Sequence, residues 1–225
     1  KPQVTYRKAN FGLEVVHNGP VQEGQIALFR VATKRGRNIT YSYDWNNDGT
    51  FDLVDRSEST AEHRFPDNGA YVVGVMAKDN RKRAQVLTTT IQVLNVPPIA
   101  VASNSGPVAE EEPVTIFVSP KDPGKDTFTY SFDLDNDGVY EIKDQLEPKV
   151  SHAFTQEGTH IVNVKVRDDD GGIGSAVTVV EVSRGVMKVD AGEDVQAQEG
   201  DTITFSGKAP DAVSTVTYRW DFGDG

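Results

Sequence analysis

Two acidic segments of this sequence have the residue types and spacing of a calcium-binding loop. One begins at Asp44 and reads D-W-N-N-D-G, and the other begins at Asp133 and reads D-L-D-N-D-G. Both fit the pattern D-x-[DN]-x-D-G that opens an EF-hand loop, in which oxygen ligands alternate and glycine allows a sharp turn. A hard cation such as Ca²⁺ binds such oxygens. The candidate ligands are Asp44, Asn46, Asp48, Asp133, Asp135 and Asp137.

The same segments have a second interpretation as hairpin turns. Asp52 and Glu141 follow in equivalent places, but the twelfth position, where an EF-hand has a bidentate glutamate, holds Asp55 and Asp144. An Asp-Gly pair supplies the positive φ of a tight β-turn, and exposed acids add solubility. The sequence leaves the calcium loop and the solvated hairpin both open.

Common catalytic motifs are absent from the sequence, which has no nucleophile elbow, phosphate-binding loop, H-E-x-x-H or dinucleotide fingerprint. Of its four histidines, His63 and His152 stand 89 residues apart at equivalent positions, and His160 takes the place of Tyr71 on a strand. We interpret these three as structural. The sequence therefore predicts that the chain is not an enzyme.

The overall charge narrows the possible partners. The chain has 23 basic and 34 acidic residues and a net charge of −11, which argues against binding nucleic acid. No apolar run approaches the roughly 20 residues of a membrane-spanning helix, so no membrane insertion is expected within this segment. The absence of cysteine excludes disulfides and thiolate metal sites. A start without methionine and a stop partway through a repeat indicate a fragment of a longer protein.

The acidic segments recur because the chain repeats with a period just under ninety residues. The segment Y-S-Y-D-W at Tyr41 returns as Y-S-F-D-L at Tyr130 and as Y-R-W-D-F at Tyr218, 89 and then 88 residues later. A series of phenylalanines, Phe29, Phe117 and Phe205, also keeps a step of 88. This period exceeds that of solenoid units and fits whole domains in tandem, each with its own core.

Within each repeat the apolar residues alternate with period two, as in residues 71–77 and 160–166. Short alternating segments between Gly, Pro, Asp and Asn clusters are typical of an all-β sandwich. On the strand that precedes each acidic segment, we expect Ser42, Asp44, Ser131 and Asp133 to point outward. The residues predicted to be buried are Tyr43, Trp45, Phe132, Leu134, Trp220 and Phe222.

Breaks in composition set the expected boundaries. The prolines of N-V-P-P at 95–98 and the segment S-R-G at 183–185 separate the repeats. We expect a linker or the end of a preceding domain at 1–14, repeat 1 at 15–95, repeat 2 at 96–184 and an incomplete repeat 3 at 185–225. The predicted fold is all-β: tandem Ig-like β-sandwiches, two complete and one truncated.

Several of these segments resemble the PKD (polycystic kidney disease) domain family. Residues 218–225 read Y-R-W-D-F-G-D-G, which is similar to the family signature Y-x-W-D-F-G-D-G. The segment N-V-P-P at 95–98 resembles N-x-P-P, and E-G-D-T-I-T-F at 199–205 resembles E-G-D-x-V-T-F. The resemblance covers essentially the whole chain, although repeats 1 and 2 replace W-D-F-G-D-G by the more acidic hairpin segments.

The resemblance implies an Ig-like β-sandwich of extracellular or cell-surface proteins. It also implies a calcium site like that of PKD domains in secreted collagenases, where Ca²⁺ lies between the segment leading into the domain and two loops at the same pole. The matching residues of repeat 2 are Asn95, Asp122, Asp168 and Asp170. Adjacent aspartates repel one another unless they are solvated or neutralised, which favours a bound cation there.

Repeat 1 departs from that pattern because its corresponding loops read K-R-G-R at 34–37 and N-R-K-R at 80–83. These six basic residues would repel Ca²⁺. They could contact an anionic glycan, lipopolysaccharide or an acidic partner. The alternative is a solvated charged end, or a neutralising contact with acidic residues of a preceding domain.

The resemblance implies two functions that the sequence does not separate. The leading hypothesis is a non-catalytic extracellular spacer or adhesion segment of a large multidomain surface or secreted protein. Its partners would be other domains of the same chain, and glycans or cell-surface and matrix proteins. The alternative is an accessory module of a secreted hydrolase that binds a glycan or collagen-like substrate.

At the junction of repeats 1 and 2, we expect Ca²⁺ to stiffen the chain. A head-to-tail arrangement would bring the first acidic hairpin, with Asp44, Asn46, Asp48 and Asp52, toward the acids of repeat 2. Like charges gathered there would repel one another over a screening length of about 8 Å, and a divalent ion would remove that repulsion.

Overall fold

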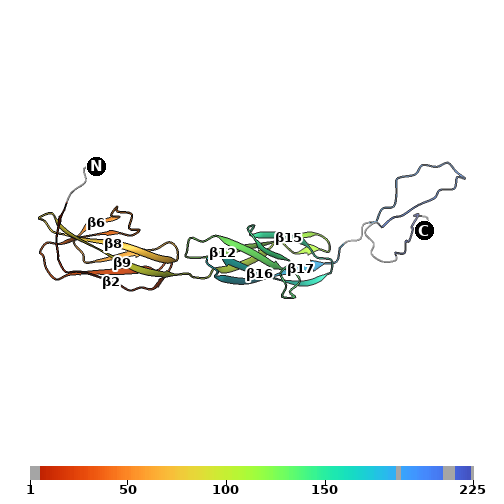
Figure 1. Ribbon diagram of the computed structural model, residues 1–225. Coiled ribbons are helices and arrows are strands. Elements are labelled where there is room, and N and C mark those ends of the chain that lie inside the picture. Colours follow the sequence, from red (N-terminus) through yellow and green to blue (C-terminus); the bar gives the residue numbers. More distant parts are fainter. Residues whose placement is uncertain (1–5, 186–188, 210–215, 224–225) are drawn as a thin grey trace.

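The computed structural model of the 225-residue chain describes residues 6–185, 189–209 and 216–223. Two β-sandwiches lie end to end along one axis, joined by a short segment, and the third copy of the repeat follows at the far end of repeat 2 (Figure 1). Within the described ranges there is no helix, and therefore none that could span a membrane.

Repeat 1 is a sandwich of two sheets. The larger has the order β1 (Arg7–Lys8), β9 (Arg83–Leu94), β8 (Gly69–Lys78), β5 (Thr40–Asp44) and β6 (Leu53–Arg56), and β3 (Val21–Gln22) also pairs in parallel with β9. The smaller has the order β2 (Leu13–His17), β4 (Ile26–Thr33) and β7 (Thr60–Arg64).

Repeat 2 has the same arrangement. Its larger sheet has the order β11 (Val108–Ala109), β17 (Ile173–Ser183), β16 (Gly158–Asp168), β13 (Phe128–Asp133) and β14 (Ile142–Gln145). Its smaller sheet has the order β10 (Ile99–Asn104), β12 (Pro113–Lys121) and β15 (Lys149–Ala153). The predicted all-β fold of tandem Ig-like sandwiches is confirmed for these two repeats.

Repeat 1 begins earlier than the sequence predicted. Strand β1 pairs in parallel with β9, and the amide of Phe11 donates to the Gln85 side chain, so the chain is part of the sandwich from Arg7 onward. Phe11 and Leu13 are both buried in the core of repeat 1. The expected linker at 1–14 is therefore too long. A short edge strand bonds through its backbone and leaves no alternating pattern to recognise.

Each sandwich has its own hydrophobic core, as predicted. Tyr43, Trp45, Phe132 and Leu134 are buried, which confirms the expected core face of β5 and β13 and of the residues that follow them. The Trp45 ring lies between two others, with ring centroids 4.5 Å from His63 and 5.1 Å from Tyr43. The alternation of apolar residues thus gives each repeat an independent centre of packing.

The polar residues on the other face of β5 and β13 do not point into solvent. Ser42, Asp44, Ser131 and Asp133 are all buried, contrary to the expectation that they alternate outward. The reason is that each following hairpin folds back over them. Its backbone amides donate to their side chains, as Asp55 does to Ser42 and Gly49 does to Asp44.

The phenylalanine series does not mark equivalent positions in the structure. On the alignment set by the pairing of β4 with β7 and of β12 with β15, Phe29 corresponds to Ile116, which is buried. Phe117 points outward and is 43% exposed. The equivalent step here is 87 residues, and a shift of one residue turns a strand side chain to the opposite face.

The third copy does not form a sandwich in the described residues. Residues 189–209 and 216–223 contain no strand, only an isolated bridge between Asp190 and Lys208. Trp220 is 38% and Phe222 63% exposed, so the prediction that both are buried is wrong. In repeats 1 and 2 the matching strand pairs with β8 or β16, whereas residues 216–223 pair with no strand in the described part of the chain. Asp224 and Gly225, the end of the signature, lie outside the described residues.

The two tryptophans allow a matched test of this difference. We expect Trp45→Ala to destabilise repeat 1 by about 3–5 kcal/mol because it removes a packed aromatic ring and leaves a cavity. Trp220→Ala, in the matching segment of the third copy, should change the free energy of unfolding by no more than about 0.5 kcal/mol. Chemical denaturation followed by circular dichroism measures both, and equal losses in the two variants would contradict the structure.

Candidate metal centre between the repeats

The first acidic hairpin uses its oxygens to hold its own turn. Asp44 accepts hydrogen bonds from the amides of Asp48 and Gly49, and Asp48 accepts one from Thr50. Asn46 likewise accepts from the Asp48 amide, and Asp52 from that of Trp45. The pattern D-x-[DN]-x-D-G is therefore explained by side-chain capping of a tight turn in this repeat.

The second hairpin repeats these bonds, except that the Asp137 amide does not donate to Asp133, and it gathers more charge. One carboxylate oxygen of each of Asp133, Asp135, Asp137 and Glu141 lies within 4.8 Å of the others. Asp133 is 2% exposed, and its Oδ1 has no hydrogen-bond donor among the residues that the structure describes. Repeat 1 has Asn46 where repeat 2 has Asp135, so the two predicted loops are not electrostatically equivalent.

The twelfth position of the EF-hand pattern does not face either loop. Asp55 forms an ion pair with Lys78 at 2.6 Å, and the amide of Asp144 donates to Ser131. Both residues have positive φ, 53° and 50°. Glu141, at the ninth position, takes part in the cluster instead, although its carboxylate also accepts from the Leu134 amide at 2.6 Å.

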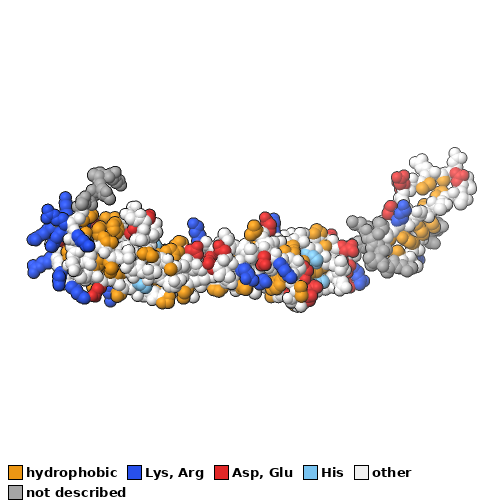
Figure 2. Space-filling view, in the orientation of Figure 1, with side chains coloured by type: hydrophobic (Ala, Val, Ile, Leu, Met, Phe, Trp, Pro, Cys, Tyr) orange, Lys and Arg blue, Asp and Glu red, His pale blue; other side chains and the backbone are white. Residues whose placement is uncertain are grey.

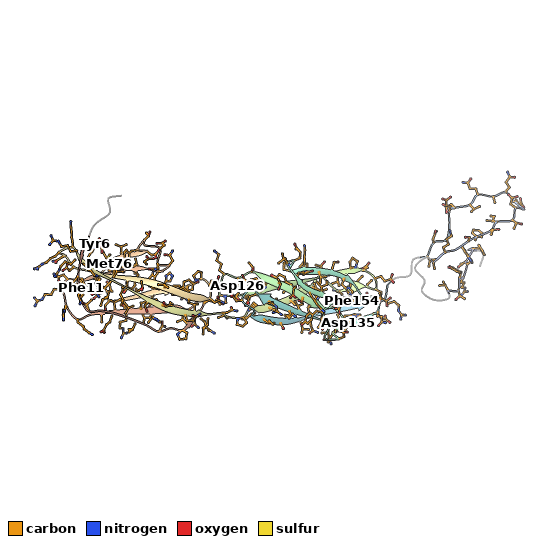
Figure 3. All side chains as sticks on the ribbon, in the orientation of Figure 1. Tyr6, Phe11, Met76, Asp126, Asp135 and Phe154 are labelled. Carbon is orange, nitrogen blue, oxygen red and sulfur yellow. The ribbon has the colours of Figure 1, made fainter. Side chains whose placement is uncertain are left out.

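The second predicted calcium site lies at the opposite end of repeat 2. Its residues come from the segment that leads into the domain and from two loops, and the structure brings these three segments together. The Asn95 amide donates to Asp168 at 3.0 Å, and the other oxygen of Asp168 accepts from the Gly172 backbone at 2.6 Å. The amide of Gly124 donates to Asp122 at 2.7 Å, and Asp126 approaches Asp169 and Asp170 within 4.8 Å. Figure 3 places Asp126 where the two sandwiches meet and Asp135 toward the far end of repeat 2.

Repeat 1 adds two acids to this end that sequence reasoning missed. Glu23, in the turn after β3, and Asp67, between β7 and β8, each bring an oxygen within 4.8 Å of Asp126. Glu23 is 1% exposed and accepts a hydrogen bond at 2.6 Å from the amide of Val96. The residues of the junction therefore come from both repeats.

Several oxygens of the junction are buried without any hydrogen-bond donor among the described residues. They are Glu23 Oε2, Asn95 Oδ1, Asp122 Oδ2 and both carboxylate oxygens of Asp126. A buried oxygen without a donor is costly, and a proton on the carboxylates or a shared cation would lower that cost. Oxygens of carboxylate and amide type are those that Ca²⁺ prefers, and the donor set fits that ion.

The first acidic hairpin does not supply the junction as predicted. Asp44 pairs with Gly74, whereas the end of β8 near repeat 2 is Gly69, five residues or roughly 17 Å further along the strand. The hydrogen bonds of Asp44, Asn46, Asp48 and Asp52 stay inside their own hairpin. Repeat 1 contributes Glu23 and Asp67 in their place.

Comparison with known families accounts for the shared architecture. PKD domain profiles match residues 12–93 and residues 95–182, which correspond to repeats 1 and 2. The chain belongs to the PKD domain family. PKD domains are generally non-catalytic modules and typically occur in extracellular proteins. No curated protein sequence matches the chain.

Solved structures similar to the chain include other β-domains. One is the PKD domain of an M14-like peptidase from Thermoplasmatales archaeon SCGC AB-540-F20, with 21% identity, 40% of this chain and 100% of that chain covered, and a TM-score of 0.35. Another is a two-domain fibronectin type-III segment of chicken tenascin, with 12% identity, 75% and 97% coverage, and a TM-score of 0.47.

The first PKD domain provides an internal comparison for the buried aspartate of the second. Asp79 stands 89 residues before Asp168 and is equally buried. Arg83 donates to it from Nε at 2.8 Å and forms an ion pair at 2.7 Å. Burial raises the pKa of Asp79, but hydrogen bonds from Arg83 and Arg81 and the charge of Arg83 outweigh it and lower the pKa overall. A built-in cation thus neutralises Asp79 in the first domain, whereas Asp168 in the second is bonded by the Asn95 amide and the Gly172 backbone.

The loops around Arg83 form the basic pole predicted from the sequence. Figure 2 shows Lys and Arg side chains gathered at the outer end of the first PKD domain. Lys34 pairs with Glu14, which neutralises part of this charge. The six predicted residues are Lys34, Arg35, Arg37, Arg81, Lys82 and Arg83.

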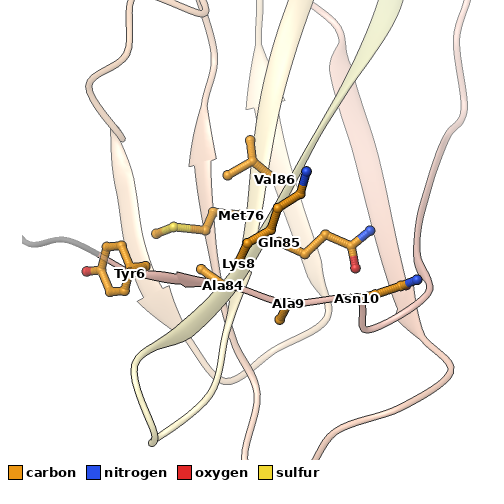
Figure 4. Close-up of a pocket in the computed structure, with 8 residues that line it drawn as sticks. All are labelled: Tyr6, Lys8, Ala9, Asn10, Met76, Ala84, Gln85 and Val86. Carbon is orange, nitrogen blue, oxygen red and sulfur yellow. The ribbon is translucent and has the colours of Figure 1, made fainter.

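Beside the basic pole, an open groove of about 570 Å³ runs along β1 (Figure 4). Tyr6 and Met76 line it with Val86 of β9. The histidines lie elsewhere and make structural contacts, since His63 stacks on Trp45 and His160 Nε2 lies 2.8 Å from the Gln156 carbonyl. None of these contacts forms a nucleophile–base pair.

The junction acids predict an unusual pH dependence in the absence of divalent ions. Burial and the neighbouring carboxylates of Asp122 and Glu23 raise the pKa of Asp126 from 3.8 to about 7. The folded state therefore keeps a proton that the unfolded state releases, and the free energy of unfolding falls as the pH rises from about 4 to about 7.

Denaturation in chelator at several pH values tests this expectation. Wild type should lose stability between pH 5 and pH 7.5 relative to Asp126→Asn, which cannot ionise. Excess Ca²⁺ should remove much of that difference, because a cation replaces the proton. Parallel stability curves for the two proteins in chelator would contradict the raised pKa of Asp126.

Proposed function

We propose that this segment is a non-catalytic extracellular spacer that holds other domains of a large surface or secreted protein apart and presents them for adhesion. The observation that carries the proposal is a hydrogen bond between the first PKD domain and the linker, which the Val96 amide donates to Glu23. A freely jointed linker would have no such bond to the preceding domain. The two domains would therefore behave as one extended unit rather than as two domains that reorient freely about a flexible linker.

The linker itself supports a restricted joint. β9 ends at Leu94 and β10 begins at Ile99, so residues 95–98 connect the domains, and two of them are prolines. Short proline-containing linkers are semi-rigid. The turn at Gly24 also lies against Pro123, since a Cβ on Gly24 would be 2.7 Å from the Pro123 side chain.

Calcium is the cation that we propose to complete the stiffening. Asn95 belongs to the linker, and its Oδ1 is buried without a donor beside Asp168. Asp122 Oδ2 is also buried without a donor among the described residues. Ca²⁺ held by Asn95, Asp122, Asp168 and Asp170 would neutralise the loops and fix the linker residue against the second domain. The junction would then resist bending more in Ca²⁺ than in chelator.

An accessory substrate-binding role is the second candidate. The groove along β1 presents Tyr6 and Met76 beside a basic pole, and aromatic and basic surfaces suit anionic glycans. The groove is open rather than enclosed, and it lies at the far end of the first domain from the junction. Binding assays with soluble anionic glycans and collagen-like peptides separate the two roles, because saturable binding would favour the accessory module.

The calcium part of the proposal predicts a change in both stability and shape. In Ca²⁺ the chain should melt at a higher temperature than in chelator, because the ion binds only the folded state. Small-angle scattering should show a longer and narrower distribution of distances. Asp122→Asn/Asp170→Asn should lose most of both effects, whereas the exposed control Glu62→Gln should keep them.

Two outcomes would count against the proposal. Identical melting and identical dimensions in Ca²⁺ and chelator would remove calcium from the mechanism. A compact scattering profile in both conditions would contradict the spacer itself.

A further inference from the structure

The junction holds a group of carboxylates that neither PKD domain contains alone. We infer that a divalent cation of the Ca²⁺ class binds between Glu23 and Asp67 of the first domain and Asp126 of the second. The inference rests on the proposed spacer function and specifies its joint: the site exists only when the two domains are docked. It differs from a site built inside the second domain, because two of its three carboxylates come from the first.

The spacing of the oxygens fits this ion. One oxygen from each of the three residues lies within 4.8 Å of the others. Bonds from Ca²⁺ to oxygen are about 2.3–2.6 Å long, so two ligands of one ion are separated by at most about 5 Å. The three carboxylates can therefore reach a single ion without a rearrangement of either domain.

The state of Glu23 gives an independent reason to place a ligand there. Its side chain is 1% exposed, Oε1 is used by the Val96 amide, and Oε2 has no donor in the described residues. Both oxygens of Asp126, which shares the site, are buried without a donor as well. A buried carboxylate that lacks a partner costs several kcal/mol, and a divalent cation offsets that cost for several carboxylates at once.

The backbone makes room for the two carboxylates to approach. Gly124 lies between them, and a Cβ at this position would be 2.6 Å from Glu23 Oε2. Its amide also donates to Asp122 at 2.7 Å, which fixes the loop that carries Asp126. The loop of the second domain thus fits the buried acid of the first only because residue 124 has no side chain.

The arrangement is specific to this junction and does not follow from the family fold alone. At the other end of the second domain, Glu110 stands 87 residues after Glu23, and it accepts hydrogen bonds from the Glu157 and Gly185 amides. Both of its oxygens are therefore satisfied. Gln156 replaces Asp67 there, and Arg37 replaces Asp126 in the first domain. The equivalent positions compared in the two complete repeats thus lack the charge or the free oxygens.

A cation shared in this way couples binding to docking. Any ion that binds the docked arrangement and not the separated one shifts the equilibrium toward the docked arrangement. Removal of the ion leaves three acids in contact, which must take up protons or separate. The joint is consequently predicted to respond to the free Ca²⁺ concentration.

Substitutions in the first domain test the inference on the full chain. Calorimetric titration with Ca²⁺ and luminescence of Tb³⁺ should show binding that weakens by about tenfold or more in Glu23→Gln and in Asp67→Asn, because each removes one ligand charge. Gln keeps an oxygen acceptor for the Val96 amide, so this variant preserves the hydrogen bond between the first domain and the linker. Glu62→Gln removes an exposed acid from the same domain and should bind as wild type does.

The outcomes separate this inference from the proposed function. Unchanged Ca²⁺ affinity in both Glu23→Gln and Asp67→Asn, or no binding at all by wild type, would overturn the shared site. Weakened binding in both variants, with scattering that does not change between Ca²⁺ and chelator, would keep the site but contradict stiffening. Circular dichroism of each variant checks that the sandwiches are folded. Because Glu23→Gln and Asp67→Asn lie on separate turns, misfolding of one variant still leaves the other as a test.

Discussion

A carboxylate buried between two domains is the constraint on which the rest of the junction depends. Glu23 lies where solvent cannot reach it, and one oxygen holds the linker while the other faces the acids of the second domain. Burial raises the pKa of Glu23, and the hydrogen bond from Val96 only partly opposes this. A proton or a cation would offset the cost of this burial, and the spacing of neighbouring oxygens suits a divalent ion.

The two PKD domains solve the same electrostatic problem in different ways. Asp79 and Asp168 occupy equivalent buried positions, but Arg83 neutralises the first while an amide and a backbone N–H satisfy the second. The first solution is permanent because the guanidinium is covalently part of the chain. The second leaves the surrounding acids dependent on solution conditions. One fold thus supplies a basic pole in the first domain and an acidic pole in the second.

The sequence predicted what is encoded locally. Alternation along a strand and a turn pattern within ten residues identified the sandwiches, Trp45 and Leu134 in their cores, and the hairpin acids. The junction acids escaped because Glu23, Asp67 and Asp126 lie on three separate turns and meet only when two domains dock. A signal was nevertheless present, since Asp126 stands where the first repeat has Arg37. Such a reversal of charge between equivalent positions marks a surface with a different neighbour.

The third copy shows that a family signature and a folded domain are separate properties. Its segment beginning at Tyr218 is closest to the PKD signature, yet Trp220 and Phe222 are far more exposed than Trp45 and Leu134. In the complete repeats, β5 and β13 are held by β8 and β16, which lie 25 or more residues later in the chain. Burial of the signature therefore requires a distant strand rather than the signature itself. Among the described residues of the third copy, the Phe205 ring lies against those of Trp220 and Phe222 without a sheet to hold them.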